Sequence, residues 1–416
     1  MRWVALLVAI IAPFGLEGRA VAQFSPSGGA LLDSKGGVQP EKDAPVDNAG
    51  YDKGNFDGFF IQSSDGQFRL NLGAWAQLRY AGVWRETPPD GDKRFEAGFQ
   101  VPQSRFFFEG KLTDRIEYHL RFKIDDAGQF GLQVAYAGWN FKASDRRPGR
   151  KGGFFNLRAG RQFLAFTREN WMMFSDLLTT SNSAVNQVFA VSTVDGVQGF
   201  YGRDRGRMWY SVSNGLSGGA EDFPNNRTSQ LMMAVRGESL LAGDDFNTFN
   251  DLVGRKGRAF GVLLGVATNY ALSGTDNPAG RSRNSGQVTV DLSVGGDGFQ
   301  AMVYGMWAWE AVGEVRSQWG FVAQAGYFIF EPWEVYAQYS LVDPGATAGL
   351  LPFNQLTLGT SAFPFNWTNR MKLSLEGALL FNPINSTLVT PSTAIGWLPA
   401  DVGRQYYLRV QLQFGF

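Results

Sequence analysis

The sequence contains no cysteine and only one histidine, His119. Without cysteine the chain can form neither disulfides nor thiolate metal sites, and it has no thiol nucleophile. Because the chain has a single histidine, a zinc site built on several histidines is also excluded. We therefore expect a protein without a metal or other cofactor.

Charge is also scarce. Charged residues make up 18% of the chain, and its 38 basic residues are balanced by 38 acidic ones. A general nucleic-acid binder would carry a strong excess of positive charge, so we expect no nucleic-acid partner. Glycine (52 residues) and aromatic residues (14%) are instead abundant. Both are typical of a protein with many strands, many turns and an exposed aromatic surface.

Long apolar runs are missing except at the N-terminus. Arg2 precedes an almost unbroken apolar stretch over 3–16, and the small residues 20–22 follow it. This order predicts a secretory signal peptide. The alternative, a membrane anchor, would need about 20 apolar residues. The sequence is therefore divided into a signal peptide over 1–22, a poorly ordered polar leader over 23–56 and a single domain over 57–416.

Within that domain, segments of about ten residues alternate between apolar and polar side chains. The clearest examples are 116–125, 287–294, 370–379 and 405–416. Successive side chains of a strand point to opposite faces, so each segment has one apolar and one polar face. The pattern predicts about 16 strands, at 68–84, 99–112, 116–125, 131–141, 155–164, 196–202, 206–214, 229–238, 258–271, 286–294, 298–310, 317–330, 333–342, 354–360, 369–381 and 404–416.

A soluble β-sandwich also alternates, with its apolar face turned inward. The connection lengths favour a membrane barrel instead, because such barrels have short periplasmic turns and longer outer loops. Short connections at 113–115, 202–206, 295–297 and 331–332 all fall on one side. Two connections on that side, 142–154 and 239–257, are long and break the rule.

Aromatic residues support the same fold. Tryptophan and tyrosine near strand ends suit the membrane interface, where the ring is apolar and its polar tip stays wet. Seven such residues lie on the apolar faces of the expected strands: Trp307, Trp309, Trp319, Tyr327, Trp333, Tyr339 and Tyr406. The prediction is an all-β, transmembrane antiparallel β-barrel in contact with outer-membrane lipids.

Three stretches resemble the phosphate-selective porin family (the porin O and P group). Residues 57–73 are similar to its opening hairpin, 101–112 to its second strand, and 157–169 to the strand that enters its pore-constricting loop. Phe416 is similar to the final aromatic residue that the outer-membrane assembly machinery reads. The resemblance covers most of the chain after about residue 55. It implies a 16-stranded barrel, a homotrimer and a third outer loop folded into the lumen.

A channel selects solutes through its width and through the charges along its lumen. The alternation places both signs of charge there, and the pore-lining candidates are Arg105, Glu109, Glu117, Arg121, Lys123, Arg158, Arg370, Lys372 and Arg409. Four of them, Arg105, Arg121, Lys123 and Arg158, lie on neighbouring strands and form the expected anion-attracting strip. The alternative is that these residues are solvated wall positions that pair with one another.

The connection 165–195 is the candidate constriction loop, because a long loop in a compact fold is often functional. Its charged candidates are Arg168, Glu169 and Asp176. The alternative is a lid on the outer surface.

The function expected from these features is passive diffusion of small polar or ionic solutes, including anions such as phosphate, through an outer-membrane porin. A plugged structural or adhesive barrel that binds a partner is the main alternative. A barrel enzyme would need an activated nucleophile or paired acid and base. His119 has no second histidine to work with, and Glu109 and Glu117 more simply neutralise nearby arginines, so we expect no enzyme.

Overall fold

The computed structural model describes most of the chain from residue 59 onward. The described residues are 21–24, 30–32, 38–40, 59–88, 90–124, 128–141, 154–189, 191, 193–215, 229–273, 284–312, 314–345, 351–365, 369–383, 397–398 and 402–415. Most of the expected signal peptide, the connection 142–153 and Phe416 lie outside them. Within these ranges no helix is long and apolar enough to cross a membrane.

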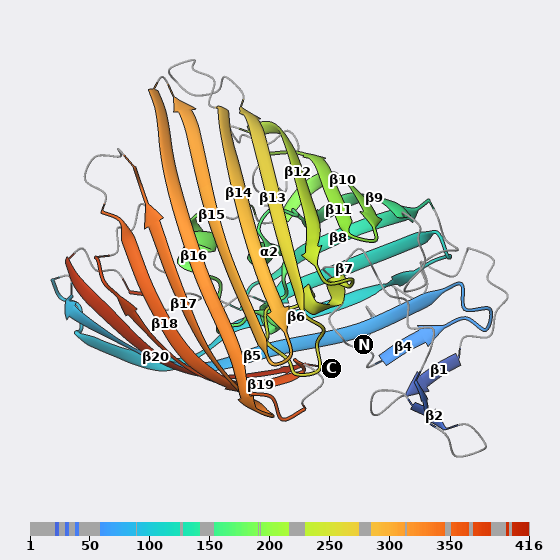
Figure 1. Cartoon of the computed structure of the whole chain (residues 1–416), viewed down its shortest axis with the longest axis horizontal. Helices are drawn as coiled ribbons and strands as arrows, with labels where there is room; N and C mark the ends of the chain where they lie inside the picture. Colours follow the sequence, from blue (N-terminus) through green and yellow to red (C-terminus); the bar gives the residue numbers. More distant parts are fainter. Residues whose placement is uncertain are drawn as a thin grey trace.

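Sixteen antiparallel strands, β5 to β20, form a closed ring (Figure 1). Each strand pairs with its neighbour in sequence, and β20 pairs with β5 to close the barrel. The predicted all-β barrel of about 16 strands is confirmed. The strands are β5 (Arg69–Thr87), β6 (Phe95–Lys111), β7 (Ile116–Ile124), β8 (Phe130–Asn140), β9 (Phe154–Phe163), β10 (Thr193–Arg203), β11 (Gly206–Ser213), β12 (Ser229–Ala242), β13 (Gly261–Ser273), β14 (Asn284–Gly296), β15 (Phe299–Val312), β16 (Glu314–Phe330), β17 (Trp333–Asp343), β18 (Phe353–Ala362), β19 (Met371–Leu380) and β20 (Val402–Gly415).

Four short strands precede the ring. β4 (Phe59–Gln62) pairs with β5, and β1 (Val21–Phe24) pairs with β4. β2 (Ala30–Leu32) and β3 (Val38–Pro40) pair only with each other.

Each barrel strand exposes its apolar side and buries its polar side. In β20, Leu408 and Val410 are 48% and 45% exposed, whereas Gln405 and Arg409 are fully buried. This is the reverse of a soluble sandwich, which hides its apolar face. The outer wall is therefore suited to lipid, and the polar side chains point into the ring.

The connections define two ends of the barrel. The turn end carries the short connections 112–115, 204–205, 297–298 and 331–332. The loop end, opposite to it, carries the connection between β9 and β10. The long connection between β12 and β13 leaves from the turn end, where the alternation predicts a short turn. Residues 243–260 form it, and we call them the turn-end segment.

The outer wall carries aromatic residues near both ends. Tyr327 and Trp333 are exposed close to the turn end, and Trp307 and Trp319 are exposed farther toward the loop end. One charged pair interrupts this apolar surface. Arg161 of β9 donates two hydrogen bonds, of 2.8 and 2.9 Å, to the carboxylate of Asp195 on β10.

Candidate pore lining

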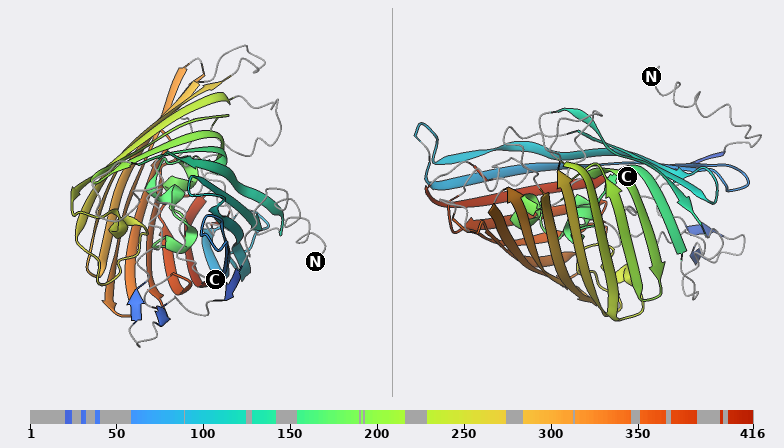
Figure 2. Two further views of the ribbon diagram at one scale, coloured as in Figure 1. Left: turned by 90° about the vertical axis from the view of Figure 1, so that its right-hand side faces the viewer. Right: turned by 90° about the horizontal axis from the view of Figure 1, so that it is seen from above.

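Three short helices follow β9 in the described residues 164–189 and 191, which we call the loop-end segment. They are α2 (Arg168–Trp171), the 3-10 helix η1 (Phe174–Asp176) and α3 (Ala184–Phe189). The Thr167 hydroxyl caps α2 by accepting a hydrogen bond of 3.0 Å from the backbone N–H of Asn170. Figure 2 shows the short helices, in green, beside the inner faces of the strands.

Glu169 ties the two ends of this segment together and to the wall. Its carboxylate accepts hydrogen bonds from the Ser183 hydroxyl (2.7 Å) and from the Tyr304 hydroxyl of β15 (2.6 Å). Burial raises the pKa of Glu169 above its ordinary value, and these hydrogen bonds oppose that rise. Glu169 is predicted as a charge of the constriction loop, and these contacts let it position the segment against β15.

The opposite side of the segment is held by β19. The Glu376 carboxylate accepts hydrogen bonds of 2.8 Å from both the backbone N–H and the hydroxyl of Thr180. The Lys372 ammonium donates to the carbonyl oxygens of Leu177 (2.7 Å) and Leu178 (3.2 Å). The charge of Lys372 is thus used to hold the backbone of the loop-end segment.

Apolar contacts hold the segment at two further places. Met173 lies in a buried cluster with Trp75 of β5 and Phe107 of β6. On the far side, α3 lies against Gly320 of β16, where an added Cβ would come within 2.8 Å of Val185. A side chain at residue 320 would therefore push α3 away from the wall.

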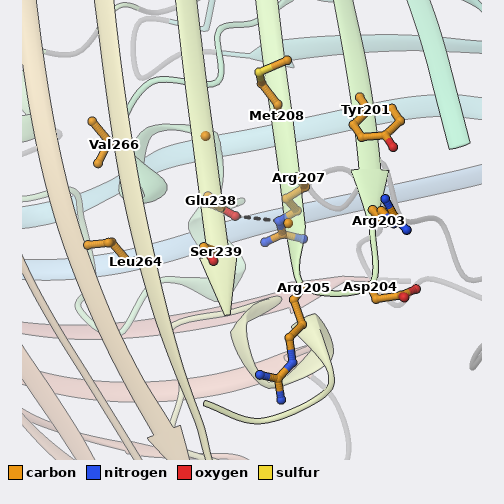
Figure 3. Close-up of a pocket in the computed structure, with 12 residues that line it drawn as sticks. Tyr201, Arg203, Asp204, Arg205, Arg207, Met208, Glu238, Ser239, Leu264 and Val266 are labelled. Atoms are coloured by element: carbon orange, nitrogen blue, oxygen red, sulfur yellow. Dashed lines mark hydrogen bonds and ion pairs between the residues drawn. The ribbon is translucent and has the colours of Figure 1, made fainter. Parts of the chain in front are cut away.

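A network of buried ion pairs lines β11, β12 and β14. Glu238 accepts from Arg207 at 2.6 Å and from Arg236 at 2.7 Å, and Arg236 also reaches Asp291 at 2.6 Å. Figure 3 shows the Arg207–Glu238 contact. The candidate Arg168 joins the network at 3.7 Å from Glu238. Arginine is here neutralised by carboxylates inside the wall.

The expected anion-attracting strip lies on β6, β7 and β9. Arg105 is 5% exposed and sits over the rings of Trp75 and Phe174, at 5.6 and 5.7 Å. Arg121 is 4% exposed and sits over Phe163, at 5.7 Å. Lys123 is exposed.

The rest of this region carries both signs of charge. Arg158 pairs with Glu117 at 2.9 Å, and Glu109 lies 3.1 Å from His119. The pairing alternative therefore describes Arg158, Glu109 and Glu117, while Arg105 and Arg121 rest against aromatic rings.

Two candidates remain. Arg409 of β20 is fully buried, 3.5 Å from Glu376 and 3.7 Å from the ring centre of Tyr407. Arg370 is half-buried and lies just before β19, whose first residue is Met371, and not within the expected strand.

Sequence reasoning missed Arg79, Arg207, Arg236 and Glu238. Arg79 of β5 donates hydrogen bonds of 2.8 Å to the side-chain oxygen of Gln411 and to the carbonyl oxygen of Thr180. A signal was present, because these residues share the polar side of expected strands. The alternation along a strand shows which side chains share a face, but it does not show which charges on different strands contact one another.

A hollow lies on the outer wall near the turn end of β10 to β13 (Figure 3). Tyr201, Met208, Leu264 and Val266 line it. An added Cβ at Gly237 would meet nothing within 4 Å, so the missing side chain contributes to the hollow.

No protein-family model matches the chain, and no curated protein matches it in sequence. Solved structures do match. The anion-selective porin from Comamonas acidovorans has a TM-score of 0.57 at 12% identity, and the match covers 83% of this chain and 99% of that one. The barrel has the fold of outer-membrane porins.

Two further porin-fold structures agree. The outer membrane channel DcaP of Acinetobacter baumannii gives a TM-score of 0.53 at 11% identity, covering 85% of this chain and 99% of that chain. The trimer form of the outer membrane protein OmpT of Vibrio cholerae gives 0.51 at 13% identity, covering 83% and 99%.

Proposed function

We propose that this chain is an outer-membrane porin, a channel for passive diffusion of small polar or ionic solutes with a preference for anions. The observation that carries the proposal is the reversed distribution of side chains. Apolar residues are exposed on the outside of a closed ring, and polar and charged residues are enclosed by it. In a membrane, a strand structure satisfies all its backbone groups only when it closes into such a ring.

The anion preference rests on the inner wall of β5 to β7. Arg105 contacts aromatic rings and Lys123 is exposed. Positive charges held in this way attract anions to a low-dielectric channel. Anions such as phosphate are accordingly the favoured solutes. The structural likeness to a protein described as an anion-selective porin agrees with this preference.

In this proposal the turn end faces the periplasm and the loop end faces the outside. The segment 1–22 directs export, Phe416 is read by the assembly machinery, and the chain acts as a homotrimer without enzymatic activity. The likeness to a structure described as a trimer form supports the oligomeric state. Chemical cross-linking of the folded protein in detergent would test it, since only monomers would be recovered if the proposal is wrong.

The test of function is a recording of single-channel current and reversal potential in planar lipid bilayers, across a potassium chloride gradient. We expect discrete ohmic steps and an anion-favouring potential, and partial block by added phosphate. Arg105→Gln should move the reversal potential toward cations, because it removes a positive charge from the inner wall. Arg203→Gln is the matched control, because Arg203 is exposed at the turn end of β10.

The main alternative is a plugged structural barrel that binds a partner without conducting. The two segments that pack against the inner wall are the observation in its favour. Inserted protein that gave no current steps would favour this alternative and overturn the porin. An unchanged reversal potential in Arg105→Gln would remove only the anion preference.

A further inference from the structure

The middle of the turn-end segment, residues 248–255, is mostly buried, although the segment connects two strands at the end of the barrel. Of residues 248–255 only Asn250 is exposed. The connection begins with η2 (Phe246–Phe249), capped by the Asp245 carboxylate, which accepts a hydrogen bond from the Asn247 backbone N–H at 2.9 Å. A connection that lay outside the ring would leave most of these side chains in water.

Its contacts lead from β12 around the inner wall. Phe249 is fully buried against Leu240 of β12 and Leu263 of β13, both inward-facing. The Gln300 side chain of β15 then donates a hydrogen bond of 3.0 Å to the carbonyl oxygen of Asp251. The path thus starts beside the strand that the segment leaves and moves away along the ring.

The path continues to the start of β19. Val253 packs with Phe328 of β16 and with Phe363, which follows β18. The backbone N–H of Gly254 donates to Glu334 of β17 at 2.7 Å, and the Arg255 guanidinium donates to Asn369, just before β19. The segment therefore follows the inside of the turn end from β12 to the start of β19, along half of the sixteen strands.

One glycine explains how closely the segment lies on the wall. A Cβ at Gly254 would come within 2.8 Å of the Phe299 Cα and 2.9 Å of the Gln300 nitrogen. Only a residue without a side chain can approach the β15 backbone so closely. The contact is with backbone, which cannot move aside as a flexible side chain could.

The turn-end segment also meets the loop-end segment. The backbone N–H of Leu252 donates to the carbonyl oxygen of Asp176 at 2.9 Å, and Arg168 donates to the carbonyl oxygen of Phe249. Asn369 donates to the Asp176 carboxylate at 2.7 Å. The two segments enter from opposite ends of the barrel and support each other where they touch.

Charged side chains in the turn-end segment pair with one another. Arg258 donates two hydrogen bonds, of 2.7 and 2.6 Å, to the Asp251 carboxylate, and Arg255 lies 3.9 Å from the same group. Paired charges contribute little net field to a channel. The segment therefore fills part of the lumen and contributes little net charge to it.

We propose that the turn-end segment is a second constriction of the channel, which limits the size of the solutes that pass and leaves their charge preference unchanged. This inference rests on the proposed porin function. In this inference the turn-end segment limits the size of the solutes, and the wall of β5 to β7 sets the preference for their charge. The two properties can therefore be changed separately.

The first test replaces residues 246–255, whose charged residues are Asp251 and Arg255, with a short Gly-Ser linker and records single-channel currents in planar bilayers. We expect conductance to rise roughly twofold with the same reversal potential, because channel width rises without loss of wall charge. A folded variant with wild-type conductance would overturn the second constriction. A wild-type protein that never conducts would instead overturn the porin function, so the two failures differ.

The second test leaves the fold intact and uses the absence of native cysteine. Asn250→Cys is modified with a bulky methanethiosulfonate reagent added to the turn-end side during recording. Because Asn250 is the exposed member of the buried stretch, we expect the current to fall by roughly 20–50%. Asp244→Cys is the matched control, exposed at the outer start of the same connection, and its labelling should leave the current unchanged. An unchanged current after complete labelling of Asn250→Cys would overturn the proposal.

Discussion

Arginine is held in two different ways on two parts of the inner wall. On β11 to β14, Arg207 and Arg236 are bound by the carboxylates of Glu238 and Asp291. On β6, Arg105 rests on the aromatic rings of Trp75 and Phe174. The same residue type therefore serves structure in one region and leaves a positive field in the other.

The difference follows from the partners that the register places opposite each arginine. A buried charge that is paired contributes little potential at a distance, and its loss exposes its partner to a large desolvation cost. A charge that is stacked on a ring keeps its field. We therefore expect substitution of the paired residues on β11 to β14 to change stability, and substitution of Arg105 on β6 to change ion preference.

The largest expected effect is from Glu238→Gln. The change removes the carboxylate that contacts Arg207, Arg236 and Arg168, and breaking a buried network of this kind costs about 3–5 kcal/mol. The urea concentration at which the folded barrel unfolds in detergent should fall accordingly. Stability equal to that of the wild type would mean that the network does not hold this part of the wall.

The next effect is pH-dependent and concerns the junction of the two inner segments. Burial and the neighbouring Asp251 carboxylate raise the pKa of Asp176 to about 6, from an ordinary value of 3.8. The folded protein therefore holds this proton more tightly than the unfolded chain. Its contribution to stability is complete in acid and is lost as pH rises from about 4 to about 6, by at most about 1.4 kcal/mol per pH unit.

Asp176→Asn should remove this dependence, since an amide does not titrate. Unfolding in urea, measured at several pH values across that window, should give a flatter profile for the variant than for the wild type. Parallel profiles would show that Asp176 is not the titrating group. The variant also reveals whether the junction holds a neutral side chain as well as a charged one.

A smaller effect on stability, but a clear one on selectivity, is expected from Gln411→Glu. It places a carboxylate where an amide oxygen now accepts from Arg79 at 2.8 Å, and so adds a negative charge to this part of the inner wall. The gain of the ion pair and the cost of burying it should nearly cancel, within about 1 kcal/mol. The reversal potential should nevertheless move toward cations. An unchanged potential would break the comparison between the two regions.

The smallest effect is expected outside the barrel interior. Arg205 and Asp244 form an ion pair of 2.8 Å, with side chains 59% and 92% exposed. Exposed pairs contribute about 0–1 kcal/mol. Arg205→Ala should therefore leave both the urea midpoint and the reversal potential almost unchanged, and a large loss of stability would show that exposure does not separate the two kinds of pair.

The strands could be predicted because the alternation is local. The expected strand 116–125 is found as Ile116–Ile124, and 333–342 as Trp333–Asp343. For β12 the alternation predicts an end at residue 238, whereas the strand continues to Ala242. The outward direction of the aromatic residues followed from the same two-residue period.

The partners of the inner charges could not be predicted in the same way. Arg236 meets Asp291 only because β12, β13 and β14 pair in one register. The paths of the two inner segments depend on still more distant contacts, such as that between Asp176 and Asn369. No local pattern in 239–257 indicates that the connection turns back along the wall.

The outward pair of Arg161 and Asp195 has a consequence for how the barrel sits in lipid. The pair lies two residues from the loop ends of β9 and β10, among apolar side chains. A charge on the lipid face costs about 2–4 kcal/mol at the bilayer midplane and almost nothing near the headgroups. In the proposed outer-membrane setting, the pair would therefore fix how deep the barrel lies, because Arg161 and Asp195 are favoured at the level of the headgroups and not within the hydrocarbon core.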